Sequence, residues 1–467
     1  MKYRQVDDEV IAKLQAICSE KYVLTSDEIR RDYSHDETED LSFMPDVVVK
    51  PGNAEEVSAI LKYCTTEKIA VTPSGARTGL SGGALPVNGG INLSVERFNR
   101  IIEIDERNLQ ATVEPGVINQ VFHDACKEKG LFYPPDPSSW GSSFLGGNLA
   151  LNAGGPRAVK YGVTSAYVLN LEVVTPTGDI LWTGANVLKN STGYNFTQLF
   201  VGSEGTLGVI TKAVFRLIPY PKHDMLMLVP FASAEKACEA VSAIFRAGIT
   251  PSAMEFMERD AIDWTLKYVE DVQLPVGEEV QAHLLIEVDG NDPEALMKDC
   301  EAIAGIVEDF EAGEVLFADN QNDKDALWKL RRRVGEAVKS NSVYKEEDTV
   351  VPRAELARLL KGVKEIGRRY GFKSVCYGHA GDGNLHVNIV KGDMSDDAWD
   401  HELTHGIREI FQLVKKLGGT ISGEHGIGLV QKPYLDVVFH EKLLHLHRAI
   451  KNQFDPAGIM NPGKVFD

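Results

Sequence analysis

The sequence predicts an α+β protein with more than one domain. Its 467 residues exceed the usual length of a single domain, so two or three domains are expected. The first half alternates short β-rich runs with helical segments around many glycines, and the order strand, helix, apolar strand occurs twice between residues 223 and 318. Two such units are typical of an antiparallel sheet covered by helices.

The expected elements follow from local sequence patterns. In the first half, helices are expected at 53–68 and 118–130, and strands at 69–75, 90–96, 101–105, 111–116 and 209–219. Residues 166–184 contain two strands around the turn Pro-Thr-Gly-Asp at 176–179. After about residue 390 the pattern is mainly helical. No low-complexity tract and no fixed repeat occurs.

Changes in the pattern of expected strands and helices along the chain suggest four segments. The strongest falls near residue 221, in the proline-containing stretch IPYPKHD. We expect a charged helical segment at 1–41, a first domain at 42–221, a second at 222–420 and a helical C-terminal segment at 421–467.

Composition excludes several classes of function. A net charge of −19 and a pI near 5.2 argue against general binding to nucleic acid or anionic membranes. The six cysteines are scattered without a CxxC pair, which indicates reduced thiols and no iron–sulfur signature. The N-terminus reads as a polar amphipathic helix, and no apolar run approaches the roughly 18 residues of a membrane span. We therefore expect a cytoplasmic protein.

A glycine-rich loop, PSGARTGLSGGALP at 73–86, follows a predicted strand. Its glycines leave backbone N–H groups free to approach an anion such as a diphosphate. No GxxxxGK[ST] motif occurs, and the loop leads into another strand, unlike a Rossmann fingerprint. By itself the loop is explained equally well by tight β-turns.

Two histidines flank a tight turn in YGHAGDGNLHVNI at 377–389. Strands on either side of Gly381-Asp382-Gly383-Asn384 would bring His379 and His386 within a few ångströms. Neutral imidazole is a common ligand of divalent transition metals. The stretch SGEHGIG at 422–428 supplies Glu424 as a candidate third ligand. Each histidine alone fits an incidental place in a hairpin.

A second pattern, HELTH at 401–405, matches the zinc-protease signature HExxH. We discount it, because the apolar stripe of its helix places the three motif residues mainly on the polar side. Those residues are His401, Glu402 and His405, and the stripe contains Leu403, Ile407, Ile410, Phe411 and Val414.

The glycine loop belongs to a larger pattern. The segments PPDPSS (134–139), GSSFLGGNLALNAGGP (141–156), YGVT (161–164) and GSEGTLGVIT (202–211) follow it in order. Together they resemble the FAD domain of the vanillyl-alcohol oxidase and p-cresol methylhydroxylase type. The resemblance implies FAD contacts from Pro73, Ser74, Gly75, Arg77, Thr78, Gly79, Ser81, Gly82, Pro137, Ser138, Gly146, Asn148, Gly154, Gly155, Gly162, Glu204, Gly208, Val209 and Ile210. The stretch GARTG has neither histidine nor cysteine, so we expect FAD to be bound non-covalently.

The second half resembles the C-terminal domain of FAD-linked 2-hydroxy-acid oxidoreductases, which include glycolate oxidase catalytic subunits, D-lactate dehydrogenases and D-2-hydroxyglutarate dehydrogenases. The matching segments are LWKLRRRVGEA, YGHAGDGNLHVNI, SGEHGIGLVQK and FDPAGIMNPGK, so the resemblance extends from about residue 42 to 464. It implies that residues 421–467 return to the flavin site. It also implies metal ligands at His379, His386 and Glu424 and a general base at His425. Arg331 would be a catalytic residue whose cation binds the substrate carboxylate. Further substrate contacts are implied at Lys345, Asn388 and Asn461.

The family chemistry follows from these roles. A 2-hydroxy acid would bind a divalent metal, zinc or alternatively manganese or iron, and lose its hydroxyl proton to His425 and a hydride to flavin N5. Electrons would pass to electron-transfer flavoprotein or partner subunits, with oxygen as the second choice. A sugar or alcohol oxidase would lack the paired histidine segments, whereas a non-enzymatic flavin-binding subunit stays open.

One position departs from the family pattern. Dehydrogenases for D-2-hydroxyglutarate have a threonine one helical turn after the arginine, where this chain has Gly335. Glycine offers no side-chain hydrogen bond to a second carboxylate. This favours a short monocarboxylate, with D-lactate first and glycolate next. Lys345 favours the longer dicarboxylate, so D-2-hydroxyglutarate stays an alternative.

Overall fold

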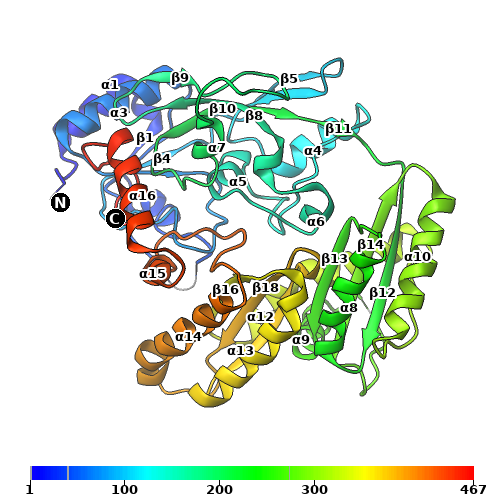
Figure 1. Cartoon of the computed structure of the whole chain (residues 1–467). Coiled ribbons are helices and arrows are strands. Elements are labelled where there is room, and N and C mark those ends of the chain that lie inside the picture. Colours follow the sequence, from blue (N-terminus) through cyan, green and yellow to red (C-terminus); the bar gives the residue numbers. More distant parts are fainter. Residues whose placement is uncertain (1–2, 39–40, 273, 467) are drawn as a thin grey trace. The chain divides into compact units, whose positions relative to one another are not determined.

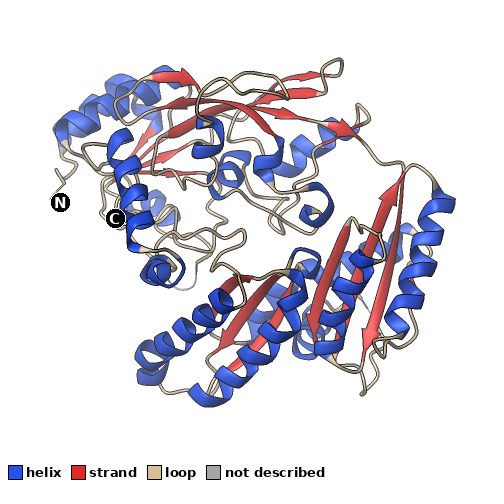
Figure 2. Cartoon of the chain, in the orientation of Figure 1, coloured by secondary structure: helices blue, strands red, loops and turns tan. Residues whose placement is uncertain are grey.

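The computed structural model describes the chain except for residues 1–2, 39–40, 273 and 467. The chain divides into two compact units (Figures 1 and 2). The first unit comprises residues 1–154, 163–220 and 424–467, and the second comprises 155–162 and 221–423. Both contain helices and sheets, so the α+β prediction is confirmed.

The first unit contains a four-stranded sheet in the order β1-β2-β4-β3. Strands β2, β4 and β3 run parallel, and β1 is antiparallel to β2. Helices α1 and α3 pack on it through a shared apolar core. The bounds are α1 Asp8–Cys18, β1 Val23–Leu24, α2 Asp27–Asp32, β2 Val47–Val49, α3 Ala54–Glu67, β3 Val71–Ser74 and β4 Ile91–Ser94.

A second sheet of the first unit has five antiparallel strands in the order β5-β6-β10-β8-β9. A two-stranded pair, β7 with β11, lies apart from it. The expected elements of this region are confirmed. The bounds are β5 Ile101–Asp105, β6 Gln110–Val113, α4 Asn119–Lys127, β7 Leu131–Phe132, α5 Leu145–Leu151, β8 Val168–Val174, β9 Ile180–Trp182, α7 Phe196–Phe200, β10 Val209–Arg216 and β11 Ile218–Pro219.

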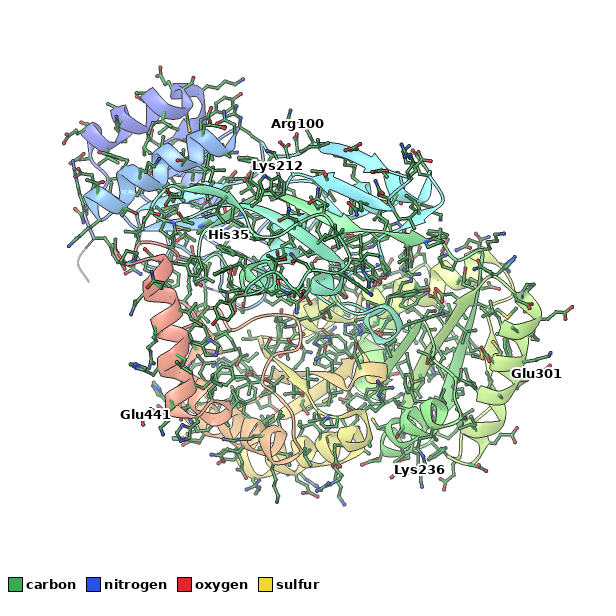
Figure 3. All side chains as sticks on the ribbon, turned by 45° about the horizontal axis from the view of Figure 1, so that its top comes forward. His35, Arg100, Lys212, Lys236, Glu301 and Glu441 are labelled. Atoms are coloured by element: carbon green, nitrogen blue, oxygen red, sulfur yellow. The ribbon has the colours of Figure 1, made fainter. Side chains whose placement is uncertain are left out.

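The C-terminal segment completes the first unit. Residues 424–467 carry α15 (Leu435–Val438) and α16 (Glu441–Phe454), and Figure 3 shows Glu441 at the start of α16. Met460 bridges Val71 of β3 in parallel, and the buried Lys451 donates to the carbonyl oxygens of Thr206 and Met460 at 2.8 Å each. The bridge to Val71 and the hydrogen bond to Thr206 attach the end of the chain to segments that lie much earlier in the sequence.

The second unit is built on a seven-stranded antiparallel sheet in the order β15-β12-β14-β13-β17-β18-β16. The two predicted strand–helix–strand units are its β12-α8-β13 and β14-α10-β15. Strand bounds are β12 His223–Phe231, β13 Ala253–Glu258, β14 Ala282–Gly290, β15 Leu316–Phe317, β16 Tyr344–Val350, β17 Lys373–Gly378 and β18 Asn384–Val390. Helix bounds are α6 Ala158–Tyr161, α8 Ala234–Arg246, α9 Arg259–Tyr268, α10 Pro293–Glu308, α11 Gln321–Arg332, α12 Val334–Asn341, α13 Leu356–Tyr370 and α14 Leu403–Lys416.

Helices cover both faces of this sheet. Helices α8, α10, α13 and α14 lie on one face, and the labelled Lys236 and Glu301 point from α8 and α10 into solvent (Figures 1 and 3). Helices α9, α11 and α12 cover the other face, where Met257, Val334 and Tyr377 share an apolar cluster. Because alternate residues of a strand face opposite ways, each sheet position has a defined side.

No helix within the described residues is long and apolar enough to cross a membrane.

Candidate active site

The first glycine-rich loop begins where β3 ends, at Ser74. A Cβ at Gly75 would lie 3.6 Å from the backbone nitrogen of Gly147, so this loop contacts the start of α5. A Cβ at Gly147 would meet no atom within 4 Å. Two glycine-rich segments far apart in the sequence therefore meet at a surface where a ligand can approach the backbone.

Two polar side chains at these loops lack partners. Ser81 Oγ and Asn148 Nδ2 are buried, and neither has a hydrogen-bond partner among the described residues. Buried polar atoms in native proteins are nearly always paired. Both residues belong to the predicted FAD contacts, and their open bonding capacity fits a ligand with many polar groups, such as a dinucleotide.

Two other predicted contacts are engaged by protein atoms. Ser74 Oγ donates to Asn92 Oδ1 at 2.6 Å. The Arg77 guanidinium carbon lies 4.0 Å from the ring centroid of Tyr33, with a cation–π geometry, at a backbone φ of 59°. The hydrogen bond and the cation–π contact stabilise the conformation of the loop.

The glycines of the later loops have packing reasons of their own. A Cβ at Gly146 would lie 2.6 Å from Pro115 Cβ, and one at Gly208 would lie 2.6 Å from the carbonyl oxygen of Val174. Gly155 and Gly162 group with the second unit. The remaining predicted contacts lie on the first unit's loops and element ends, at Pro73, Thr78, Gly79, Gly82, Pro137, Ser138, Gly154, Val209 and Ile210.

Glu204, a predicted FAD contact, binds the C-terminal segment instead of standing free. Its carboxylate accepts hydrogen bonds from the backbone N–H groups of Ile427 at 2.8 Å and Gly428 at 2.7 Å. Burial raises the pKa of Glu204 to about 7. Asn461 Nδ2 donates to the carbonyl oxygens of Glu204 and Gly83 at 2.8 and 2.9 Å. The loop that carries His425 is thus bound to the glycine-rich loop of Glu204. Asn461 joins that loop to the glycine-rich loop of Gly83.

Glu424 and Gly154 are neighbours in the first unit. A Cβ at Gly154 would lie 2.7 Å from Glu424 Oε2, so only a glycine leaves room for this carboxylate. Glu424 and His425 are both half-buried. The first unit therefore brings together Glu424, His425, Asn461 and the glycine loops.

In the second unit, His379 and His386 lie on either side of the turn that joins β17 to β18. Their ring centroids are 5.3 Å apart and the rings are nearly perpendicular, at 83°. Both side chains are buried. The turn depends on Gly383, which has φ +82° and whose Cβ would lie 2.0 Å from the carbonyl oxygen of Val351.

No sequence pattern indicates the carboxylate that binds His379. Glu255, on β13, is fully buried, and both its oxygens lie 2.9 Å from His379 Nδ1. The two residues meet because β13 pairs with β17, with Phe256 opposite Gly378. An imidazole that donates through Nδ1 keeps Nε2 for another partner.

Glu255 also binds the arginine. Arg331 Nη2, in the last turn of α11, lies 2.6 Å from Glu255 Oε2. The Arg331 guanidinium stands 5.2 Å from the ring centroid of Tyr377, and its Nε is buried without a hydrogen-bond partner among the described residues. A buried guanidinium with an unused donor is suited to an anion such as a carboxylate.

A second carboxylate that no sequence pattern indicates, that of Asp348, lies near His386 and Gly423. Asp348, on β16, is paired across the strands with His386, and its carboxylate lies 3.6 Å from His386 Nδ1. It accepts hydrogen bonds from Asn384 Nδ2 and from the backbone N–H of Gly423, each at 2.7 Å. Asp348 therefore binds Gly423, the last residue of the second unit, to β16.

Tyr377 fills the space beside Gly335. A Cβ at Gly335 would lie 3.2 Å from the Tyr377 hydroxyl. The same hydroxyl lies 3.5 Å from Glu346 Oε1, and burial raises the Tyr377 pKa well above its usual value. Asn388, a predicted substrate contact, is fully buried on the same face, opposite Glu346 in the register.

Lys345 lies on the other face of the sheet. Its register partner is Ile389, whereas Glu346 pairs with Asn388 on the face of His386. The Lys345 ammonium lies 3.4 Å from the Trp399 carbonyl oxygen and 5.2 Å from its ring centroid. This position gives no support to the predicted contact with a substrate's distal end.

The HELTH motif lies on the exposed side of its helix. A π-helical turn at Ala398–Glu402 precedes α14, and His401, Glu402 and His405 are all exposed. The reason for discounting a protease therefore holds, because the motif lies on the solvent side of an amphipathic helix.

Comparisons with known proteins agree with this architecture. Residues 220–465 match the family of FAD linked oxidases through its C-terminal domain, and residues 45–184 match an FAD binding domain. These matches define the class: the chain is an FAD-linked oxidoreductase. It belongs to the FAD linked oxidase family, as the sequence resemblance predicted.

Relatives of known name are similar over nearly the whole chain. Glycolate oxidase subunit GlcD of Bacillus subtilis is 41% identical over 93% of this chain and 92% of its own length. D-lactate dehydrogenase of Anaerostipes hadrus is 39% identical over 99% and 98%. D-2-hydroxyglutarate dehydrogenase of Stutzerimonas stutzeri is 34% identical over 98% and 99%.

Solved structures confirm the predicted fold. p-Cresol methylhydroxylase with bound substrate superposes with a TM-score of 0.80 at 17% identity, covering 98% of this chain and 96% of the other. 4-Ethylphenol oxidase of Gulosibacter chungangensis gives 0.77 at 21%, covering 100% and 98%.

Proposed function

We propose that the protein is an FAD- and metal-dependent dehydrogenase that oxidises a D-2-hydroxy acid, D-lactate first among them, to the 2-oxo acid. The observation that carries the proposal is the buried pair His379 and His386, together with Glu255, which binds both His379 and Arg331. The family membership and the names of the relatives, all enzymes of 2-hydroxy acids, support the same reaction class.

The second unit fits a divalent metal. Two buried imidazoles lie with their ring centroids 5.3 Å apart, and one already donates its Nδ1 proton to a carboxylate, as metal-binding histidines usually do. Glu424 would be the third ligand, by family resemblance. Two histidines and a carboxylate suit zinc, manganese and ferrous iron.

When bound, FAD would supply hydride-accepting redox chemistry, and the metal would supply Lewis acidity at the substrate hydroxyl. The chain's own residues do the rest. Arg331 would bind the substrate carboxylate through its unused donors. His425 would accept the hydroxyl proton, since a neutral imidazole is a suitable base near neutral pH. Asn388 and Asn461 would orient the substrate and the flavin.

The surroundings of Arg331 favour a short substrate. The Tyr377 hydroxyl occupies the space that a side chain at position 335 would need. Glu346 adds a carboxylate 3.5 Å from that hydroxyl, and its charge would repel a second substrate carboxylate. D-lactate and glycolate have no such group, whereas D-2-hydroxyglutarate does. Glycolate is therefore the second candidate and D-2-hydroxyglutarate the third.

The electron acceptor is proposed by resemblance. Relatives include a protein named as a glycolate oxidase subunit, so partner subunits are one candidate and electron-transfer flavoprotein is the other. The sequence contains no dinucleotide fingerprint for NAD(P) and no cysteine cluster for an internal relay. A non-catalytic flavin-binding subunit would need neither Arg331 nor His425.

Anaerobic flavin reduction tests the function. The purified holoprotein is mixed in turn with D-lactate, L-lactate, glycolate and D-2-hydroxyglutarate, and loss of the oxidised flavin absorption is followed. Fast reduction by D-lactate is expected, with little from the L enantiomer. Reduction by D-2-hydroxyglutarate alone would show that Gly335 and Tyr377 do not set the substrate length. No reduction by any of the four would contradict the proposed reaction.

A further inference from the structure

Glu255 is a buried carboxylate that no sequence motif singles out, yet it contacts two residues of the proposed site. It is fully buried in β13 and makes an ion pair with Arg331 at 2.6 Å. Both its oxygens also lie 2.9 Å from His379 Nδ1. A buried charge persists only when it is paired and hydrogen-bonded, and here the two partners come from α11 and from the end of β17.

The geometry decides which nitrogen of His379 is available. A carboxylate is an acceptor only, so Nδ1 must carry the proton that it donates. The lone pair is then on Nε2, on the far side of the ring. A charged acceptor behind an imidazole also makes the ring a better electron donor to a metal.

The same carboxylate limits the motion of Arg331. Nη2 of the guanidinium is ion-paired with Glu255 at 2.6 Å, and neither Nη2 nor Nε makes a hydrogen bond of good geometry among the described residues. Because the guanidinium is planar, fixing one nitrogen orients the others. The direction in which Arg331 offers its remaining donors is therefore tied to the same group that orients His379.

We infer that Glu255 is a positioning residue that holds His379 for metal binding and Arg331 for carboxylate binding at once. The inference rests on the proposed function, because it takes His379 as a metal ligand and Arg331 as the anion contact. It predicts that loss of the Glu255 charge weakens both metal and substrate binding, although Glu255 touches neither.

A matched control lies three residues away. Glu258 is also buried on β13 and also ion-paired, with Lys364 Nζ at 2.7 Å, but it faces the opposite side of the sheet. It accepts a further hydrogen bond from the backbone N–H of Cys376 at 2.7 Å. Glu258→Gln therefore breaks a buried ion pair on the same strand without touching His379 or Arg331.

The test compares Glu255→Gln with Glu258→Gln as FAD-loaded proteins. After metal removal, zinc affinity is measured by competition with a chromophoric chelator, and KM and kcat for D-lactate are measured after zinc is restored. Glu255→Gln should weaken zinc binding roughly 10- to 100-fold and raise KM. Glu258→Gln should change zinc affinity less than about threefold, although both variants unfold at lower temperature.

The outcomes separate the two proposals. Zinc affinity equal to wild type in Glu255→Gln, or an equal loss in Glu258→Gln, would overturn the positioning role. A wild-type protein that binds no zinc, manganese or ferrous iron would overturn the metal-dependent function, and this inference with it.

A second variant answers the case in which Glu255→Gln fails to fold. Replacing Arg331 as well, in Glu255→Gln/Arg331→Met, removes the uncompensated buried cation. The double variant should recover stability but keep the weakened zinc binding, because His379 still lacks its charged acceptor. Recovery of zinc affinity in the double variant would contradict the inference.

Discussion

At the scale of single residues, the candidate site depends on groups that share one sheet face. Glu255, Tyr377, His386, Glu346 and Asn388 are brought there by strand register rather than by sequence proximity. The histidines stood out in the sequence because they flank a short turn. The register partners did not, because a buried glutamate inside an apolar strand has no local pattern.

Gly335→Thr tests the crowding beside Tyr377. The new Cβ would lie 3.2 Å from the Tyr377 hydroxyl, closer than normal packing allows, and the remaining atoms of threonine add to the overlap. We expect a loss of about 1–3 kcal/mol in unfolding free energy and slower flavin reduction by D-lactate. Chemical denaturation and anaerobic stopped-flow measure the two effects.

Two further variants control for this substitution. Gly305→Thr, in α10, replaces a helical glycine whose Cβ would meet nothing within 4 Å, and should be neutral or slightly stabilising. Gly335→Thr/Tyr377→Phe removes the hydroxyl and should recover much of the stability. If Gly335→Thr and Gly305→Thr behave alike, Tyr377 does not fill this space.

At the scale of elements, the β17–β18 hairpin decides where the two imidazoles lie. The sequence predicts strands on either side of the GDGN turn at 381–384, and β17 and β18 form this antiparallel hairpin. Lys345 shows what the pattern cannot decide. The sheet face on which a side chain of an edge strand lies depends on the exact register of that strand. A shift of one residue moves the side chain to the opposite face.

Gly383→Ala tests the turn. The alanine Cβ would lie 2.0 Å from the carbonyl oxygen of Val351 at a φ of +82°, so the turn must move. We expect a loss of more than about 2 kcal/mol and a lower zinc affinity, because the two imidazoles would shift apart. Thermal unfolding and a chelator competition measure these effects.

Gly371→Ala is the matched control for the hairpin. Gly371 also has a positive φ, +76°, but its Cβ would meet no atom within 4 Å. That variant should lose only roughly 1–2 kcal/mol of unfolding free energy, because of backbone strain, and should leave zinc affinity unchanged. Equal effects of the two alanines would mean that steric contact at the turn does not determine the site.

At the scale of the whole molecule, each unit is assembled from distant segments. The resemblance to the family predicted the fold class and the two halves, since these depend on motifs spread over the chain. It did not reveal Glu255, Asp348 or the attachment of Glu204, which arise from contacts between segments that are distant in the sequence. Glu204 was predicted to face FAD, and its carboxylate binds the backbone of Ile427 and Gly428.

The attachment of the C-terminal segment should depend on pH. Burial raises the Glu204 pKa from 4.5 to about 7, so the folded state keeps a proton that the unfolded chain loses. The stabilising contribution is complete below pH 4.5 and is lost as pH rises through about 7, by up to roughly 3 kcal/mol. Glu204→Gln cannot titrate. The difference in unfolding free energy, wild type minus variant, should therefore fall across this window, and a flat difference would contradict the assignment.

The metal dependence of substrate oxidation distinguishes a metal-assisted dehydrogenase from other flavoproteins. The FAD-loaded protein is treated with a chelator and dialysed, and anaerobic flavin reduction by D-lactate is recorded before and after zinc, manganese or ferrous iron is restored. We predict that flavin reduction disappears when the metal is removed and returns with one of the three ions. In His379→Ala it should stay absent. Reduction by D-lactate at an unchanged rate in the metal-free protein would contradict a metal-dependent mechanism.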